Sequence, residues 1–368
     1  MKNIPFIIYV VLVWVLSMVN ASGLGLAYDT PSKTNLLILI WFWFVTRKHK
    51  IYGILKTNSN LVLCTVLSFI IFPLMTSGSF EGCSYLMMLP LVYCFSRQNV
   101  SETAINISGY IVAGLGLFII YVYTHTFILS GWNDNHIGMI VLFSYIYYSV
   151  SLYGNLSFKK VTIGLIISLL YIVMLSKTES RSSIIFIVLS VIFAYGGKLF
   201  KKLLQKRRFA FYALNIPLIV SLVCILFPEL SIFQYFENWS QENFNKSAFN
   251  GRDTLWIESY NRLLDSYLIG EGRFRINHHN SAVAVISVFG VIGYICWYKF
   301  FSKPIRFMQN FVNDKLVFGF LSSFLLIFWQ QSVELGFVSA SPNMIPYMIL
   351  GLGIARARKI DTICCNQR

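Results

Sequence analysis

Charge is what this chain has least of. Charged residues make up 12% of its 368 residues, whereas a soluble domain of this size carries roughly 25%. Hydrophobic residues make up 56% and the mean hydropathy is +0.64, which excludes an ordinary soluble domain and predicts a chain embedded in lipid. Lipid offers no partner to backbone N–H and C=O groups, so the spans must be helices or a closed barrel. The apolar runs are continuous rather than alternating, which favours helices.

Paired cysteines and repeats are also missing. The seven cysteines form no CxxC pair and no spacing typical of a secreted disulfide framework, so they are interpreted as small hydrophobic residues. No internal repeat is evident. This absence weakens a transporter interpretation, because many transporters are built from two related halves.

Apolar runs recur along the whole chain and predict an all-α, polytopic membrane helix bundle of about 12 transmembrane helices. The first run follows Lys2 and could be mistaken for a signal peptide, but its length favours a retained span. The run at 83–96 is the weakest of the set. The predicted spans lie near 4–20, 35–46, 60–75, 83–96, 106–128, 136–154, 161–176, 182–200, 209–227, 281–299, 316–333 and 342–356.

Acidic residues number only 15 against 30 basic ones, giving a formal net charge of +15. Such an excess can indicate a nucleic-acid partner, but cytoplasmic loops of membrane proteins are also rich in Lys and Arg. With the N-terminus inside, all but eight of the 30 basic residues fall in cytoplasmic loops or termini. The charge is therefore explained without nucleic acid, and both termini are predicted to be cytoplasmic. The eight on the outer side are Lys33, Lys177, Arg181, Lys246, Arg252, Arg262, Arg273 and Arg275.

One polar stretch divides the chain into three parts. Residues 1–227 hold transmembrane helices 1–9, residues 228–280 form a large extracytoplasmic (periplasmic) loop, and residues 281–368 hold helices 10–12 and a cytoplasmic tail. Within the loop, Asp253 is predicted to N-cap a short amphipathic helix that ends at Gly270. Its apolar face is expected on the bilayer surface or against the bundle. That face would contain Trp256, Tyr260, Leu263, Leu264 and Tyr267.

The outer arginines run against the charge preference and need a reason. Arginine offers a rigid fork of donors that matches phosphate oxygens, so a cluster at the outer face suits an anionic headgroup such as a lipid diphosphate. For each arginine taken alone, the alternative is a snorkelling or salt-bridged cation. The candidates are Arg181, Arg252, Arg273 and Arg275.

His278, His279 and Asn280 immediately precede the tenth predicted span. A histidine here could act as a general base, since its ordinary pKa is about 6.5. The alternative is a loop histidine at the membrane interface. Adjacent histidines cannot easily bind one ion and no carboxylate cluster lies near them in the sequence, so a metal site is poorly supported.

Several of these residues together resemble a known family. Gly251-Arg252 and Trp256, the Leu-Ile-Gly-Glu-Gly stretch at 268–272, His279-Asn280 and the glycines at 290 and 293 look like the signature of the O-antigen ligase and polymerase superfamily. Ser180-Arg181 before a long apolar run resembles its second signature. The turn at 133–136, ending in His136, is similar to a third and looser one.

The resemblance implies a metal-independent glycosyltransferase that needs no cofactor and uses a polyprenyl-diphosphate-linked oligosaccharide as donor. Arg181 and Arg252 would bind the diphosphate and stabilise the charge that builds on it as leaving group. His279 would take the proton from the acceptor hydroxyl. Arg273, Arg275, His278 and Asn280 complete the expected substrate-binding set, with His278 positioning the loop.

The resemblance leaves the exact reaction open. A Wzy-type O-antigen polymerase of the inner membrane, which joins lipid-linked repeat units and has a chain-length regulator as candidate partner, is favoured over an O-antigen ligase acting on lipid A–core. A flippase or transporter for lipid-linked oligosaccharide is the least favoured. The long outer loop argues against it, and so does the apparent absence of charged residues within the predicted spans, since such charges normally mark a transport path.

Overall fold

The computed structural model describes residues 4–21, 29–48, 59–126, 134–153, 157–178, 180–245, 247, 251–275, 278–334, 336–337 and 342–366. Throughout these ranges every regular element is a helix. Asn133 of the loose signature and the basic residues Lys2, Lys50, Lys56, Lys246 and Arg368 lie outside the described residues. The predicted all-α class is confirmed.

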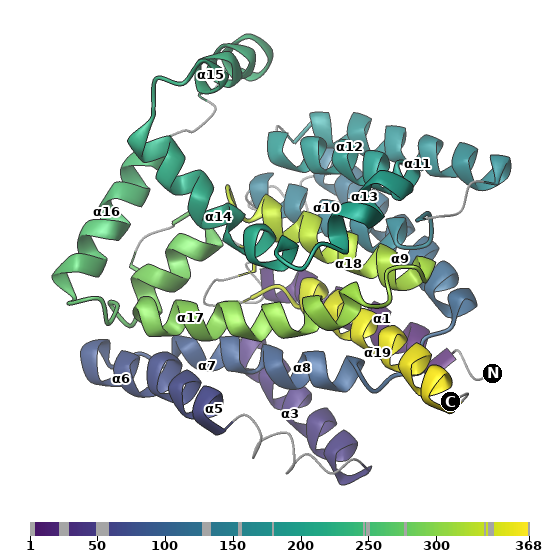
Figure 1. Cartoon of the computed structure of the whole chain (residues 1–368). Helices are drawn as coiled ribbons and strands as arrows, with labels where there is room; N and C mark the ends of the chain where they lie inside the picture. Colours follow the sequence, from purple (N-terminus) through teal and green to yellow (C-terminus); the bar gives the residue numbers. More distant parts are fainter. Residues whose placement is uncertain are drawn as a thin grey trace.

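The helices follow one another in the order shown in Figure 1. They are α1 (Ile4–Ala21), α3 (Thr30–Lys48), α5 (Ser59–Val66), the π-helical turn η1 (Leu67–Ile71), α6 (Phe72–Ser77), α7 (Glu81–Leu86), α8 (Met88–Phe95), α9 (Glu102–His125), α10 (Asp134–Ser149), α11 (Phe158–Ser176), α12 (Arg181–Tyr195), α13 (Gly197–Leu204), α14 (Phe209–Leu226), α15 (Ser231–Phe244), α16 (Arg252–Asp265), α17 (Ser281–Gln309), α18 (Lys315–Gln330) and α19 (Met344–Asn366).

Several helices have the length and composition of membrane spans. Among the described residues, five qualify: Ser59–Ser77, Glu102–His125, Phe158–Ser176, Phe209–Leu226 and Ser281–Gln309. Shorter apolar helices occupy Ile4–Asn20, Glu81–Phe95, Arg181–Tyr195 and Lys315–Gln330. Each of the twelve predicted apolar runs lies largely within one of these or within α3, α10 or α19.

The bundle is built around helices that are apolar on every side. Residues 137–149 of α10 and nearly all of α18 are buried, as expected for central helices of a large bundle. Helices at the periphery instead turn large apolar side chains outward, including Leu36 and Phe44 of α3 and Ile166 and Leu169 of α11. Apolar surface on this scale needs lipid or a partner to cover it, which fits a helical membrane bundle.

Helix α14 carries a proline that is used for packing. Pro217 has no N–H, so the carbonyl of Ala213 four residues earlier loses its partner within the helix. The indole N–H of Trp329 in α18 donates to that carbonyl at 2.9 Å. The freed polar group is thereby satisfied inside the bundle.

Helix α17 is broken at Gly290, whose φ of 71° and ψ of −178° are not helical. The broken turn is filled by residues 268–272. The amides of Glu271 and Gly272 donate to the carbonyls of Ser287 and Val288 at 2.9 and 2.8 Å, and the amide of Val291 donates to Leu268 at 3.1 Å. The two glycine-containing parts of the predicted signature therefore meet at one place in the fold.

Helix α16 differs from the predicted amphipathic helix at both ends. It begins at Arg252 with Gly251, at φ 75°, as the N-cap, so Asp253 lies in the first turn and is not the cap. It ends at Asp265. Trp256 and Leu263 are buried against the bundle, whereas Leu264 and Tyr267 are 65% and 88% exposed. The apolar face is therefore narrower than predicted.

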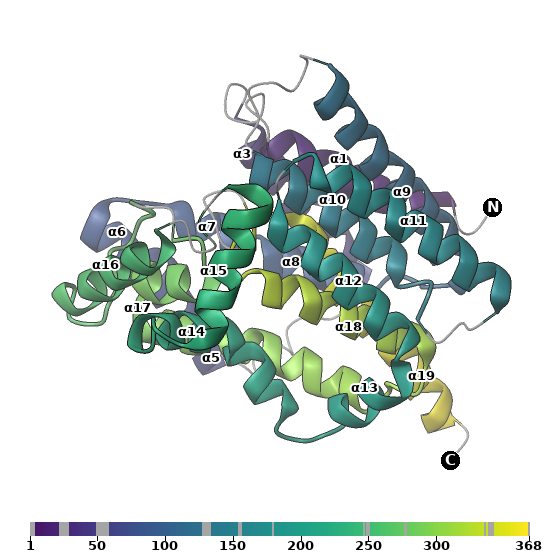
Figure 2. The same ribbon diagram turned by 90° about the horizontal axis from the view of Figure 1, so that it is seen from above.

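The start of α1 and the end of α19 lie at the opposite end of the bundle from α16 in both views (Figures 1 and 2). Helix α1 packs against α9 and α19, and Trp14 donates to Ser144 at 2.7 Å in the core. This packing fits the retained first helix that the sequence predicts.

Candidate functional site

The start of α17 is anchored by Asn280. Its Oδ1 accepts from the amides of Ala282 and Val283 at 2.9 and 3.1 Å, and its Nδ2 donates to the carbonyls of Pro217 and Ser332 at 2.8 and 3.0 Å. These bonds use both donors and both acceptor sites of the amide, and the residue is fully buried. Asn280 therefore caps α17 and connects it to neighbouring segments; its predicted role as a substrate ligand stays a prediction.

His278 is buried beside α16. Its Nδ1 lies 2.7 Å from the hydroxyl of Ser259, and its carbonyl accepts from the indole of Trp256 at 2.7 Å. Burial, assisted by the positive charge of Arg262, lowers the pKa of His278 to about 4. A neutral, 1% exposed imidazole holds the loop against α16. Its expected roles in positioning the loop and in binding substrate both stay predictions.

His279 points into a different environment. Its φ of 45° is uncommon for a residue other than glycine and turns the chain sharply. The side chain is 24% exposed, and its Nδ1 lies 3.9 Å from Oε2 of Glu334. The other carboxylate oxygen, Oε1, accepts from Nη2 of Arg252 at 3.1 Å. One buried carboxylate thus brings together the predicted base and one predicted diphosphate ligand.

The beginning of α10 lies near this carboxylate. His136, the described end of the loose signature, is close enough to Glu334 and His279 for electrostatic interaction with both. Gly336 packs directly on Met139, because a Cβ at Gly336 would lie 2.0 Å from the Met139 sulfur. Glu334 therefore contacts residues at the starts of α16 and α17, with the start of α10 close by.

Arg181 is held at the N-terminus of α12. Its Nη1 donates to the hydroxyl of Ser240 in α15 and, at 3.0 Å, to the carbonyl of Ser247. The preceding Ser180 fits against Gly138 of α10, where a Cβ would lie 2.1 Å from the serine hydroxyl. The second signature therefore packs on α10 at Gly138, two residues after His136.

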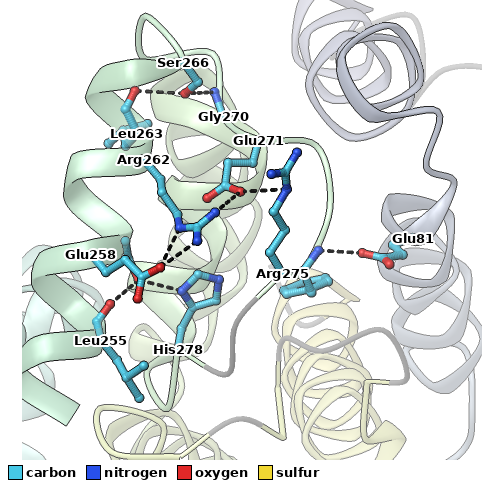
Figure 3. Close-up of polar contacts among 12 residues, drawn as sticks. Glu81, Leu255, Glu258, Arg262, Leu263, Ser266, Gly270, Glu271, Arg275 and His278 are labelled. Carbon is cyan, nitrogen blue, oxygen red and sulfur yellow. Dashed lines mark hydrogen bonds and ion pairs between the residues drawn. The ribbon is translucent and has the colours of Figure 1, made fainter. Parts of the chain in front are cut away.

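Arg273 and Arg275 lie at the other end of α16. Arg262 joins Glu258 at 2.6 Å and Glu271 at 3.3 Å, and Arg275 shares Glu271 at 3.3 Å (Figure 3). With a rise of about 1.5 Å per residue, Arg252 and Arg262 start roughly 15 Å apart. Arg273 is exposed, and the described residues give it no ion pair. Among the described residues no contact joins Arg273 or Arg275 to Arg252 or His279, and their expected substrate-binding role stays a prediction.

Glu334 is the site residue that sequence reasoning missed. It is 7% exposed, and a carboxylate so deeply buried must be paired. The available signal was its position as a single acidic residue directly after the apolar run at 316–333. Within the described ranges, no group of three or more His, Cys, Asp or Glu side chains is arranged to hold a metal ion.

Comparisons with protein-family models, with curated proteins and with solved structures find no match to this chain. The resemblance to the O-antigen ligase and polymerase superfamily therefore remains a prediction that depends on the motifs themselves.

Proposed function

We propose that the chain is a glycosyltransferase of the O-antigen polymerase type, acting on polyprenyl-diphosphate-linked oligosaccharides at the outer face of a bacterial inner membrane. The proposal includes about twelve spans, cytoplasmic termini and an extracytoplasmic 228–280 loop. The observation that carries it is the Arg252–Glu334–His279 arrangement. Three segments far apart in the chain place a guanidinium, a carboxylate and an imidazole together.

The arrangement suits a histidine base. Glu334 faces Nδ1 of His279, so it orients the ring and stabilises the imidazolium that forms when Nε2 takes a proton. His279 removes the proton of the acceptor hydroxyl as that oxygen bonds to the anomeric carbon. The bond from the anomeric carbon to the diphosphate oxygen breaks, and the diphosphate leaves with the electron pair.

Arg252 supplies positive charge for the leaving group. Glu334 occupies one of its donors, and a guanidinium has five, so others remain for phosphate oxygens. Arg181 is the second cation that we propose binds the diphosphate. It lies at the start of α12, where the preceding Ser180 packs on Gly138 of α10. Fixed cations at a developing anion lower the barrier without any rearrangement during the reaction.

The break in α17 is the feature that would favour a transporter, since discontinuous helices line many transport sites. Here residues 268–272 occupy the break through three backbone hydrogen bonds. Its polar groups are therefore satisfied by the chain itself, which favours the transferase.

The test uses the purified protein with a synthetic polyprenyl-diphosphate oligosaccharide and measures glycan length. The wild type is expected to lengthen the glycan. His279→Ala should lower the rate by about 10²–10⁴-fold, and Glu334→Gln should lower kcat more than it raises KM. His125→Ala, at an exposed histidine of α9, is the matched control.

Full activity of His279→Ala would exclude it as the base. Glycans that stay at their original length until lipid A–core is added would indicate a ligase instead. Glycans that cross a vesicle membrane unchanged would indicate a transporter.

A further inference from the structure

Two adjoining cavities lie at the end of α17 that is remote from the proposed catalytic site. The larger, of about 680 Å³, runs between α5, α8, α17 and α19 and has a mainly aromatic and aliphatic lining, including Phe69, Tyr85, Trp297 and Phe300. The smaller, of about 480 Å³, is polar and contains Ser59, Asn60 and Ser302. Leu61, Lys299 and Lys303 line both cavities, so they form one continuous site.

The polar part of this site is basic. Lys299, Lys303 and Arg306 line the smaller cavity, and Arg358 lines the larger one. Among the described lining residues of either cavity none is acidic. Burial and, after it, the nearby charge of Arg97 lower the pKa of Arg358.

This combination selects one class of ligand. The apolar cavity has the size of a small-molecule site, for which about 300–1,000 Å³ is typical. An apolar slot that opens beside several cations between membrane helices fits a molecule with hydrocarbon chains and an anionic head. The cations belong to segments that the charge pattern places on the cytoplasmic side, where anionic lipids are available.

We propose that this site binds an acidic phospholipid of the cytoplasmic leaflet, with its phosphate at Lys299 and Arg306 and an acyl chain in the cavity beside Phe69 and Trp297. The site is separate from the Arg252–Glu334–His279 arrangement, and the proposal does not depend on the proposed reaction.

The test measures lipid retention on the purified, delipidated full chain by native mass spectrometry. Phosphatidylglycerol and phosphatidylcholine with identical acyl chains are compared. One phosphatidylglycerol per chain should bind at least roughly tenfold more tightly than phosphatidylcholine, because the cations of the site attract the net negative charge of its headgroup. The Lys299→Gln/Arg306→Gln variant should lose this preference, whereas Lys159→Gln/Lys160→Gln, in the segment at the start of α11, should retain it.

Two further measurements test the apolar cavity and the headgroup contact separately. Val66→Trp places an indole in the apolar cavity and should weaken the binding of both lipids about equally. Glycerol phosphate alone should fail to displace phosphatidylglycerol. Equal binding of the two lipids, an unchanged preference in a folded Lys299→Gln/Arg306→Gln variant, or full competition by glycerol phosphate would overturn the proposal.

Discussion

His278 and His279 are neighbours in the chain but have opposite environments. His278 is buried and bonded to Ser259, whereas His279 is partly exposed and faces Glu334. A sequence of two histidines cannot show which one is exposed, because the choice depends on how α16 packs against the loop. In the structure His279 is the more exposed of the two, and its role as the base stays a proposal.

The buried state of His278 predicts acid sensitivity. The pKa of His278 is about 4 in the folded chain and about 6.5 when unfolded. Between these values the unfolded chain binds a proton that the folded chain does not, so stability falls as pH drops from 6.5 towards 4. Melting curves from pH 7.5 to 4.5 should show this loss. His278→Gln should reduce the slope, and His125→Gln should not; equal slopes in all three would contradict the lowered pKa.

The hydrogen bonds of the Asn280 side chain predict that its replacement lowers the free energy of unfolding substantially. Asn280→Ala removes four hydrogen bonds and leaves the carbonyls of Pro217 and Ser332 without this donor. We expect a loss of about 2–4 kcal/mol, more than the approximately 1 kcal/mol of an ordinary N-cap. Ser101→Ala, at the cap of α9, is the comparison. Denaturation in detergent measures both, and similar losses would show that the Nδ2 bonds contribute little.

At the scale of elements, apolar runs were sufficient to locate the apolar helices of the described residues. The missed elements are those without such a run. Helix α15 (Ser231–Phe244) contains Gln, Glu and Asn between its apolar residues, and propensity alone is a weak guide for so polar a segment. Helix α17 also continues ten residues past the predicted end at 299, because a helix can extend beyond the apolar core of a membrane.

The candidate site was predicted residue by residue with uneven success. Arg252 and His279 meet because each lies at the start of a helix that packs on the other. Arg275 instead pairs with Glu271, and a link between it and Arg252 or His279 stays a prediction. Glu334 was missed because nothing in its local pattern distinguishes a site carboxylate from a loop carboxylate. The spacing of residues along the chain does not show which distant residues, such as Glu334 and Arg252, contact each other in the fold.

The break in α17 predicts that Gly290 cannot be replaced. Its backbone lies in a region open almost only to glycine, and a Cβ would sit 2.2 Å from the carbonyl oxygen of Ile269. Gly290→Ala should destabilise the protein by more than about 2 kcal/mol and expose the amides of Glu271 and Gly272 to hydrogen exchange. Gly114→Ala, in α9 with nothing within 4 Å of its Cβ, should be neutral or slightly stabilising. Unchanged exchange in Gly290→Ala would show that residues 268–272 do not depend on the break.

At the scale of the whole molecule, the charge pattern predicts an orientation that the positions of the helix ends allow. The basic segments around Lys206 and Lys359 are predicted to be inside, and the ends of α1 and α19 lie opposite α16 (Figure 1). The cost of moving many cations across a bilayer fixes the direction of insertion. Helix α15 and the His279 region should therefore face outward together.

This orientation is testable by cysteine labelling in intact bacterial cells. Cys364 and Cys365 are exposed and are first changed to Ser. Tyr235→Cys, at a 66% exposed position of α15, should then react with a membrane-impermeant maleimide from outside. Lys206→Cys, in the exposed turn after α13, should react only after permeabilisation. The opposite result would place the Arg252–Glu334–His279 arrangement in the cytosol, away from any lipid-linked glycan on the outer face, and would remove the proposed transfer while leaving the fold unaffected.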